Sequence, residues 1–133
     1  MKKREILEQI LLRAAEVMFP DRRPKVLDVR IRDSDGDTVL HKVALWGDRY
    51  AASLLIESGA EIDAKGDMGC TPLYFAVMGG HVGTAKLLLN LGADPDAQTN
   101  LGFSPRALAL SQGKTLMVRL FKQKPNKRGP KKA

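Results

Sequence analysis

The stretch DMGCTPLYFAVMGGH, residues 67–81, decides the fold, because its pattern recurs 33 residues upstream and 33 residues downstream. Three sets of positions share this spacing: Thr38, Thr71 and Ser104; Gly36, Gly69 and Gly102; and Gly47, Gly80 and Gly113. Three independent sets with one period are not expected by chance. The chain is therefore built from internal repeats of one supersecondary unit.

Each repeat carries the local signals of two short helices joined by tight turns. The first set of glycines suits a turn with positive φ, and the Thr or Ser two residues later caps the following helix. Pro72 and Pro105 then fall at the first helical position, where a missing N–H costs nothing. The next set of glycines ends this helix, and a second apolar helix continues to Gly59 or Gly92. The sequence predicts stacked pairs of helices.

These residues resemble the ankyrin repeat. Residues 71–76, TPLYFA, and 38–43, TVLHKV, are similar to the T-P-L-H-x-A helix start of the family, and Gly80-His81 is similar to its second signature. The resemblance covers residues 34–123. Tyr74 stands where the family has His, and Arg106 and Ala107 replace Leu and His in the third repeat. The resemblance implies an all-α, ankyrin-type helical solenoid with an N-terminal capping helix and short β-turn fingers.

The predicted solenoid has three parts. Residues 1–33 hold a capping helix, expected over Glu5–Met18, and a degenerate repeat in which Leu27, Val29 and Ile31 alternate as in a strand. Residues 34–123 hold the ankyrin repeats, divided as 34–67, 68–100 and a C-terminal cap at 101–123. Residues 124–133 are expected to form a disordered basic tail. They belong to the segment KQKPNKRGPKKA, 122–133, whose only apolar residue is the final alanine.

The net charge of +7 over 133 residues is unevenly distributed. Residues 34–112 carry five Lys or Arg and nine Asp or Glu, whereas residues 113–133 carry eight basic residues and no acidic one. We therefore expect the tail to attract polyanions without specificity. This charge leaves open a nucleic-acid-associated or nuclear adaptor as the alternative function.

No motif of the chain predicts catalysis, and we expect no enzymatic activity, cofactor or bound metal. The carboxylates of residues 33–37 alternate, but the glycine among them and Ala44 do not match a calcium loop. A histidine such as His41 can act as a catalytic base, but the repeat pattern favours a structural role for both His41 and His81. The single cysteine, Cys70, excludes an internal disulfide and has no identified base.

Charged residues interrupt the apolar run after the N-terminus, and no stretch approaches the ~18 apolar residues of a membrane span. We therefore expect a soluble, cytoplasmic, monomeric protein.

The resemblance implies that the finger tips and the outward side of the first helices form a concave binding face. The residues at these positions are Asp35, Asp37, Lys42, Leu45, Trp46, Asp67, Met68, Phe75, Met78, Asn100, Leu101 and Phe103, with Leu108 beside them. For Leu45 and Leu108, packing between repeats is as strongly expected as exposure on this face. We expect Trp46, Phe75 and Met78 to form an apolar cluster at the centre of the interface, because these residue types are enriched at interfaces.

Carboxylates at the rim of this face favour a partner with a basic surface. The predicted function is recognition of another protein, with inhibitor, immunity-type protein and adaptor as the candidate roles. A non-catalytic subunit that orders the active site of another chain is a further alternative.

Overall fold

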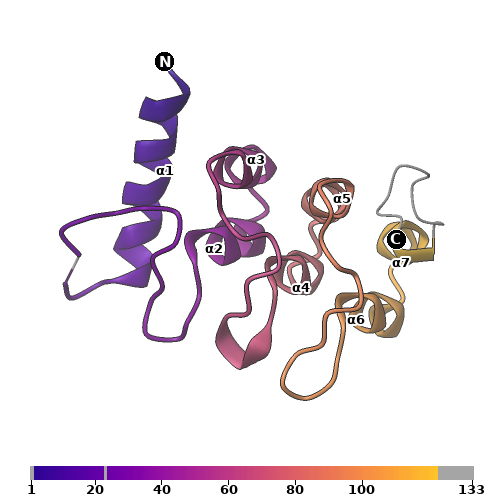
Figure 1. Cartoon of the computed structure of the whole chain (residues 1–133). Coiled ribbons are helices and arrows are strands. Elements are labelled where there is room, and N and C mark those ends of the chain that lie inside the picture. Colours follow the sequence, from indigo (N-terminus) through magenta and orange to yellow (C-terminus); the bar gives the residue numbers. More distant parts are fainter. Residues whose placement is uncertain (1, 23, 123–133) are drawn as a thin grey trace.

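The computed structural model describes residues 2–22 and 24–122 and shows a row of paired helices (Figure 1). An N-terminal helix, α1 (Lys3–Met18), is followed by α2 (Val39–Trp46) with α3 (Arg49–Glu57), α4 (Pro72–Met78) with α5 (Val82–Asn90), and α6 (Pro105–Gln112) with α7 (Thr115–Lys122). A short 3-10 turn, η1 (Asp67–Gly69), precedes α4. The predicted all-α solenoid of stacked helix pairs is confirmed.

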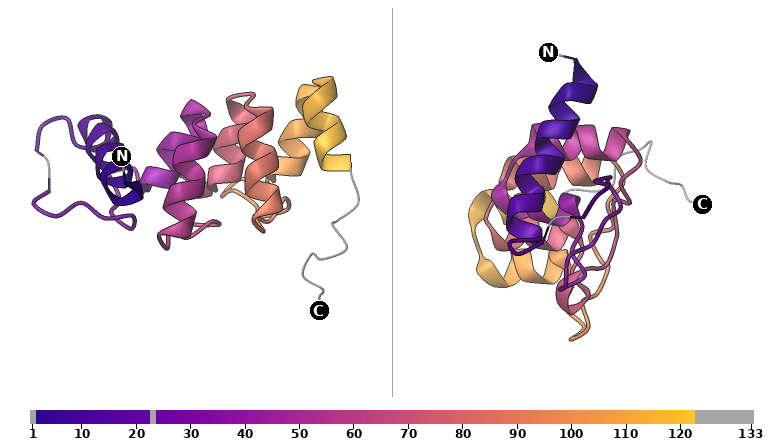
Figure 2. Two further views of the ribbon diagram at one scale, coloured as in Figure 1. Left: turned by 90° about the horizontal axis from the view of Figure 1, so that it is seen from above. Right: turned by 90° about the vertical axis from the view of Figure 1, so that its left-hand side faces the viewer.

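The six paired helices form two layers. An inner layer holds α2, α4 and α6, and an outer layer holds α3, α5 and α7 (Figure 1). The helices of each layer pack on their neighbours along the row, which Figure 2 shows as an elongated stack. Loops before α2, α4 and α6 project beyond the inner layer, on the side away from the outer layer. We call residues 33–37, 66–70 and 99–103 of these loops the first, second and third fingers.

The repeated turn and cap signals have the geometry that the sequence predicts. Gly36, Gly69 and Gly102 adopt positive φ angles of 90°, 76° and 86°, a conformation that glycine enters without steric cost. The hydroxyls of Thr38, Thr71 and Ser104 accept hydrogen bonds from backbone N–H groups three residues later, at 3.4, 3.2 and 3.0 Å. Each of the three inner helices therefore begins with a side-chain cap.

Two buried apolar clusters hold the stack together. The first joins α1 to α2 and α3 and includes Ile10, Leu11, Met18, Val43 and Leu55. The second runs from α4 to α7 and includes Leu73, Val77, Leu88, Met117 and Phe121. α1 stands upright across the N-terminal end of the row and covers the apolar sides of α2 and α3 (Figure 1).

The strand predicted around Leu27, Val29 and Ile31 is wrong. In the part of the chain that the structure describes, this segment is a loop, and Arg32 makes an isolated bridge with Thr38. A strand needs a neighbour for its backbone groups, and here the alternating apolar side chains simply pack on the first cluster. The helix α1 begins two residues earlier than expected. Lys122, the first residue of the basic segment, ends α7, and the predicted tail at 124–133 lies outside the described residues.

Candidate functional site

His41 ties the first repeat to the second finger. Its side chain is completely buried, and Nε2 lies 2.9 Å from the carbonyl oxygens of both Ala64 and Cys70. The N–H of Thr38 donates to Nδ1 at 3.0 Å, so Nδ1 is the acceptor and Nε2 carries the proton that the carbonyls accept. The structural role predicted for His41 is confirmed. His81 also has a structural contact, because its Nε2 lies 2.8 Å from the carbonyl oxygen of Leu45 at the end of α2.

Burial lowers the pKa of His41 below its ordinary value of 6.5, although the hydrogen bond to Cys70 and the nearby Asp37 act in the opposite direction. A lowered pKa in the folded state means that the unfolded chain binds a proton first as the pH falls. We therefore expect the stability that neutral His41 provides to be complete above about pH 6.5 and to be lost progressively below it. Urea unfolding at about pH 7.5 and 5.5 should show a lower midpoint at the acidic pH. A His41→Gln variant should be less stable at both pH values and show a smaller difference between them.

The acidic run of the first finger is folded around its own hydrogen bonds. The carboxylate of Asp33 accepts the N–H groups of Asp35 and Asp37, each at 3.0 Å. Lys42 Nζ lies 3.3 Å from the carboxylates of both Asp33 and Asp37. Asp37 also accepts the N–H of Asp67 at 2.8 Å and thereby joins the first finger to the second. These carboxylates stabilise the loop, which agrees with the interpretation of this run as a finger connecting repeats.

Two charged residues predicted for the binding face are thus engaged inside the protein. Asp37 is buried, and the side chain of Lys42 is only 16% exposed. Although burial lowers the pKa of Lys42, the adjacent carboxylates of Asp33 and Asp37 raise it above its ordinary value. Neither residue offers a free charge to a partner. Asp35, Asp67 and Asn100 are exposed at the finger tips, as the prediction requires.

Six large apolar side chains of the inner layer and the fingers are exposed: Leu45, Trp46, Met68, Met78, Leu101 and Phe103. We call these six residues the apolar face. Leu45, Trp46 and Met78 lie at the C-terminal ends of α2 and α4. Leu101, at the tip of the third finger, is the most exposed of the set at 70%. The apolar face is therefore most accessible at the fingers.

Phe75 does not belong to this surface. Only 9% of it is exposed, because its ring lies edge-on to His41 with centroids 5.5 Å apart. Phe75 therefore packs between repeats and does not join Trp46 and Met78 in the predicted exposed cluster. Leu108, equivalent to Phe75 in the next repeat, is half-buried and also packs on the second cluster.

The second and third fingers are joined by backbone contacts. Met68 has a left-handed conformation with φ of 58°, and its carbonyl accepts the N–H of Asn100 at 2.9 Å. Lys65 Nζ donates to the carbonyl oxygen of Gln98 at 2.5 Å. These contacts hold the exposed tips of both fingers in one surface.

Comparison with known families gives this architecture a name. The family described as ankyrin repeats (3 copies) matches residues 2–99, which is most of the chain. The protein belongs to the ankyrin repeat family. Ankyrin repeats are generally protein–protein interaction modules and generally have no enzymatic activity. No curated protein matches the chain.

The match places the ankyrin boundaries differently from the repeat pattern. It begins before α1 and ends in the third finger, whereas the sequence pattern covers 34–123. The third repeat departs most from the family, since Arg106 replaces Leu. Arg106 pairs with the carboxylate of Asp96 at 2.8 Å and donates to the carbonyl oxygen of Phe121 at 2.6 Å. A polar anchor here joins α6 to α7 and to the loop before the third finger.

One contact of this ankyrin protein was missed by sequence reasoning. The guanidinium of Arg13, on α1, lies 5.3 Å from the ring centroid of Trp46, and it also pairs with Asp48 at 3.0 Å. Trp46 therefore lies at the junction of α1 and α2, away from the centre of the apolar face. The 33-residue pattern could not predict this contact, because α1 precedes the residues that repeat.

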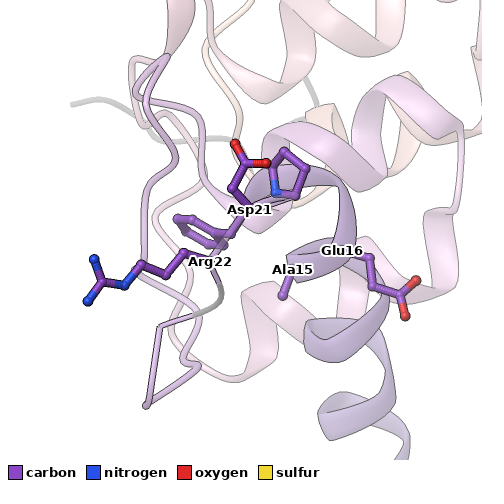
Figure 3. A pocket seen from close by; sticks show the side chains of 6 residues that line it. Ala15, Glu16, Asp21 and Arg22 are labelled. Atoms are coloured by element: carbon purple, nitrogen blue, oxygen red, sulfur yellow. The ribbon is translucent and has the colours of Figure 1, made fainter.

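Other features of the ankyrin fold provide little for catalysis. Burial raises the pKa of the Cys70 thiol, which disfavours the reactive thiolate. An open pocket of about 260 Å³ lies at the end of α1, lined by Ala15, Glu16, Phe19, Pro20, Asp21 and Arg22. Figure 3 shows that its ionisable side chains point in different directions. Among the described residues, no helix has the length and apolar character needed to cross a bilayer.

Proposed function

We propose that this ankyrin protein binds another protein through the apolar face and carries out no reaction of its own. The observation that supports this proposal most strongly is the exposure of six large apolar side chains on the inner layer and the fingers. Exposed apolar groups gathered on one surface favour association, because a partner that covers them removes them from water. Met, Phe and Trp are also residue types enriched at protein interfaces.

The charges beside the apolar face favour a partner with basic groups near the first two fingers. Asp35 and Asp67 are exposed there. Lys42 lies between two carboxylates, so its single positive charge balances only one of them. With Arg32 and Lys65 also beside them, the four carboxylates of the first two fingers exceed the adjacent cations by one negative charge. The third finger presents Leu101 and Phe103. A matching partner surface combines basic and apolar residues.

A concrete form of the proposal is an inhibitor or immunity-type protein. A rigid face with no chemistry of its own can act by covering the working surface of its partner. An adaptor that joins two proteins is the other form, and it would need a second interaction surface on the same chain.

The proposal is tested by removing apolar groups from one surface at a time. The face variant carries Met78→Ser, Leu101→Ser and Phe103→Ser. The control variant carries Tyr50→Ser, Leu91→Ser and Leu116→Ser, three apolar residues outside the apolar face that are about as exposed. We expect the face variant to bind its partner at least about tenfold more weakly, because buried aromatic and apolar groups contribute most of the affinity of an interface. The control variant should bind like the unmodified protein.

The measurement is affinity capture from a native lysate with mass spectrometry, followed by titration of the captured protein. Circular dichroism melting curves of both variants show whether the fold is intact. A partner that the face variant and the unmodified protein retain equally would place the interface elsewhere. A partner lost only with the control variant would assign binding to the opposite side of the molecule.

A further inference from the structure

The cations beside the fingers are all engaged within the protein. Arg32 donates to the carbonyl oxygens of Gly36 and Lys65 at 2.6 and 2.7 Å. Lys65 donates to Gln98, Lys42 pairs with Asp33 and Asp37, and Arg106 pairs with Asp96. These positive charges already contact carbonyl oxygens or carboxylates in the loops and joints between repeats.

The outer layer is different. Its exposed cations are Arg49, Lys86, Lys114, Arg119 and Lys122, placed on or directly before α3, α5 and α7. Within the described residues, none of these five forms an ion pair or a side-chain hydrogen bond, as the contacts found there involve other cations. Residues 71–93 and 97–122 contain no Asp or Glu at all. The outer helices α5 and α7 therefore carry uncompensated positive charge.

These cations follow the long axis of the stack. The Arg49 guanidinium extends from α3 over the start of α5, where its Nη1 lies 3.1 Å from the position that a Cβ of Gly83 would occupy. From the other side, Lys114 Nζ lies 3.9 Å from the corresponding position of Gly80. Arg119 is one repeat length from Lys86, so stacking places it next to Lys86 along the row. Cations from three successive repeats therefore lie along the outer layer.

We propose that the outer layer binds the phosphate backbone of a nucleic acid through Arg49, Lys86, Lys114, Arg119 and Lys122. Exposed cations in a row match a linear polymer with regularly spaced negative charges, because successive phosphates can contact successive repeats. The outer helices that carry these cations lie on the side of the inner layer away from the fingers (Figure 1). The proposal therefore goes beyond the protein-binding function and does not depend on the apolar face.

Charge alone distinguishes this surface from the rest of the molecule. The acidic residues Asp33, Asp35, Asp37, Asp67 and Asp96 lie in or beside the fingers, whereas the outer helices α5 and α7 contain no acidic residue. A nucleic acid would be repelled by the fingers and attracted by the outer layer, which fixes the side on which it binds. The contacts reach only the backbone, so binding is expected to show no sequence preference.

The test compares two triple variants with the same change in net charge. The outer-layer variant carries Lys86→Gln, Lys114→Gln and Arg119→Gln. The control variant carries Arg22→Gln, Lys25→Gln and Arg30→Gln, three exposed cations of the loop after α1. Both are made in the full chain, and fluorescence anisotropy measures binding to a labelled DNA duplex of about 20 base pairs in about 50 mM salt.

We expect the outer-layer variant to bind about tenfold more weakly and the slope of log K against log salt to fall by about 2 to 3, because three phosphate contacts are lost. The control variant should stay within about twofold of the unmodified protein. Equal weakening by both variants would show that only net charge matters and would overturn the proposal. An unchanged slope in the outer-layer variant would overturn it as well.

Two further arms separate other sources of binding. Deletion of residues 124–133 should weaken duplex binding and leave a residual affinity that is still sensitive to the outer-layer substitutions; complete loss of binding would assign it to those ten residues. Vesicles containing an anionic phospholipid provide the second arm. Stronger binding to vesicles than to duplex, with loss in the outer-layer variant, would replace the nucleic acid by a membrane surface and overturn the proposal.

Discussion

A chain that lacks residues 1–19 is expected to lose its cooperative unfolding transition. The deletion removes Ile10, Leu11 and Met18 from the first cluster and exposes Val43 and Leu54 on α2 and α3. Burial of a large apolar side chain contributes about 1.5 to 3 kcal/mol, so the loss approaches the whole stability of a small domain, about 5 to 15 kcal/mol. Urea unfolding followed by circular dichroism would show a broad change without a native baseline.

Point substitutions in α1 distinguish packing from simple loss of a helix. Ile10→Ala with Leu11→Ala removes two buried side chains, and each is expected to cost about 2 to 5 kcal/mol. Leu12→Ala with Val17→Ala changes two apolar residues of the same helix that are 43% and 56% exposed. This control pair should change stability by less than about 1 kcal/mol. Similar unfolding midpoints for the two pairs, or an unchanged transition after the deletion, would show that α1 does not support the stack.

The period of 33 residues predicted the repeat architecture because its signals are local. Glycine turns and hydroxyl caps act within a few residues of the chain, and Gly36 and Thr38 needed no distant partner to be recognised. The same reasoning failed for Asp37 and Lys42. Lys42 pairs with Asp37 five residues before it, and Asp37 also accepts the N–H of Asp67, 30 residues away. The second of these contacts has no local sequence signal.

Equivalent positions in successive repeats distinguish the buried from the exposed residues of the predicted binding face. Lys42, Phe75 and Leu108 occupy the same place in successive repeats, and all three are half-buried or buried. Since Leu108 was expected to pack between repeats as readily as to bind, the same alternative applied to Phe75. By contrast, Asp35, Met68 and Leu101 occupy an equivalent position at the finger tips and are all exposed. At these two sets of positions, burial follows the place in the repeat and not the residue type.

The replacement of His by Tyr74 also has a structural consequence that the sequence did not predict. In the first repeat, His41 binds two carbonyl groups of the following loop. At the next junction, Asp63 accepts the N–H of Asp94 at 3.1 Å, and Met68 accepts the N–H of Asn100. The joint around the second finger therefore depends on a buried histidine and a buried carboxylate, whereas the joint around the third depends on exposed contacts. A substitution that disrupts the joint around the second finger should therefore lower the free energy of unfolding more than one at the third finger.

Gly66→Ala is the substitution expected to damage that joint most. A Cβ at this position would overlap with the carboxylate of Asp37 and would lie 2.8 Å from Nε2 of His41. Both side chains are buried and hydrogen-bonded to the second finger, so neither can move without leaving polar groups unpaired. Loss of these bonds and displacement of a buried charge predict a cost of about 3 kcal/mol or more in the free energy of unfolding, measured with urea.

Gly102→Ala is the matched control, because it separates steric overlap from backbone strain. No atom lies within 4 Å of a Cβ at Gly102, but its φ of 86° is unfavourable for alanine, so a loss of about 1 kcal/mol is expected. Gly66 has a φ of −109°, outside the left-handed region, so we expect the overlap to be the main source of its cost. The double variant Asp37→Ala with Gly66→Ala should then lose less free energy of unfolding than the sum of the two single variants. The reason is that Asp37→Ala removes one of the overlapping side chains. A Gly66→Ala loss no larger than that of Gly102→Ala would show that the joint around His41 and Asp37 can rearrange freely.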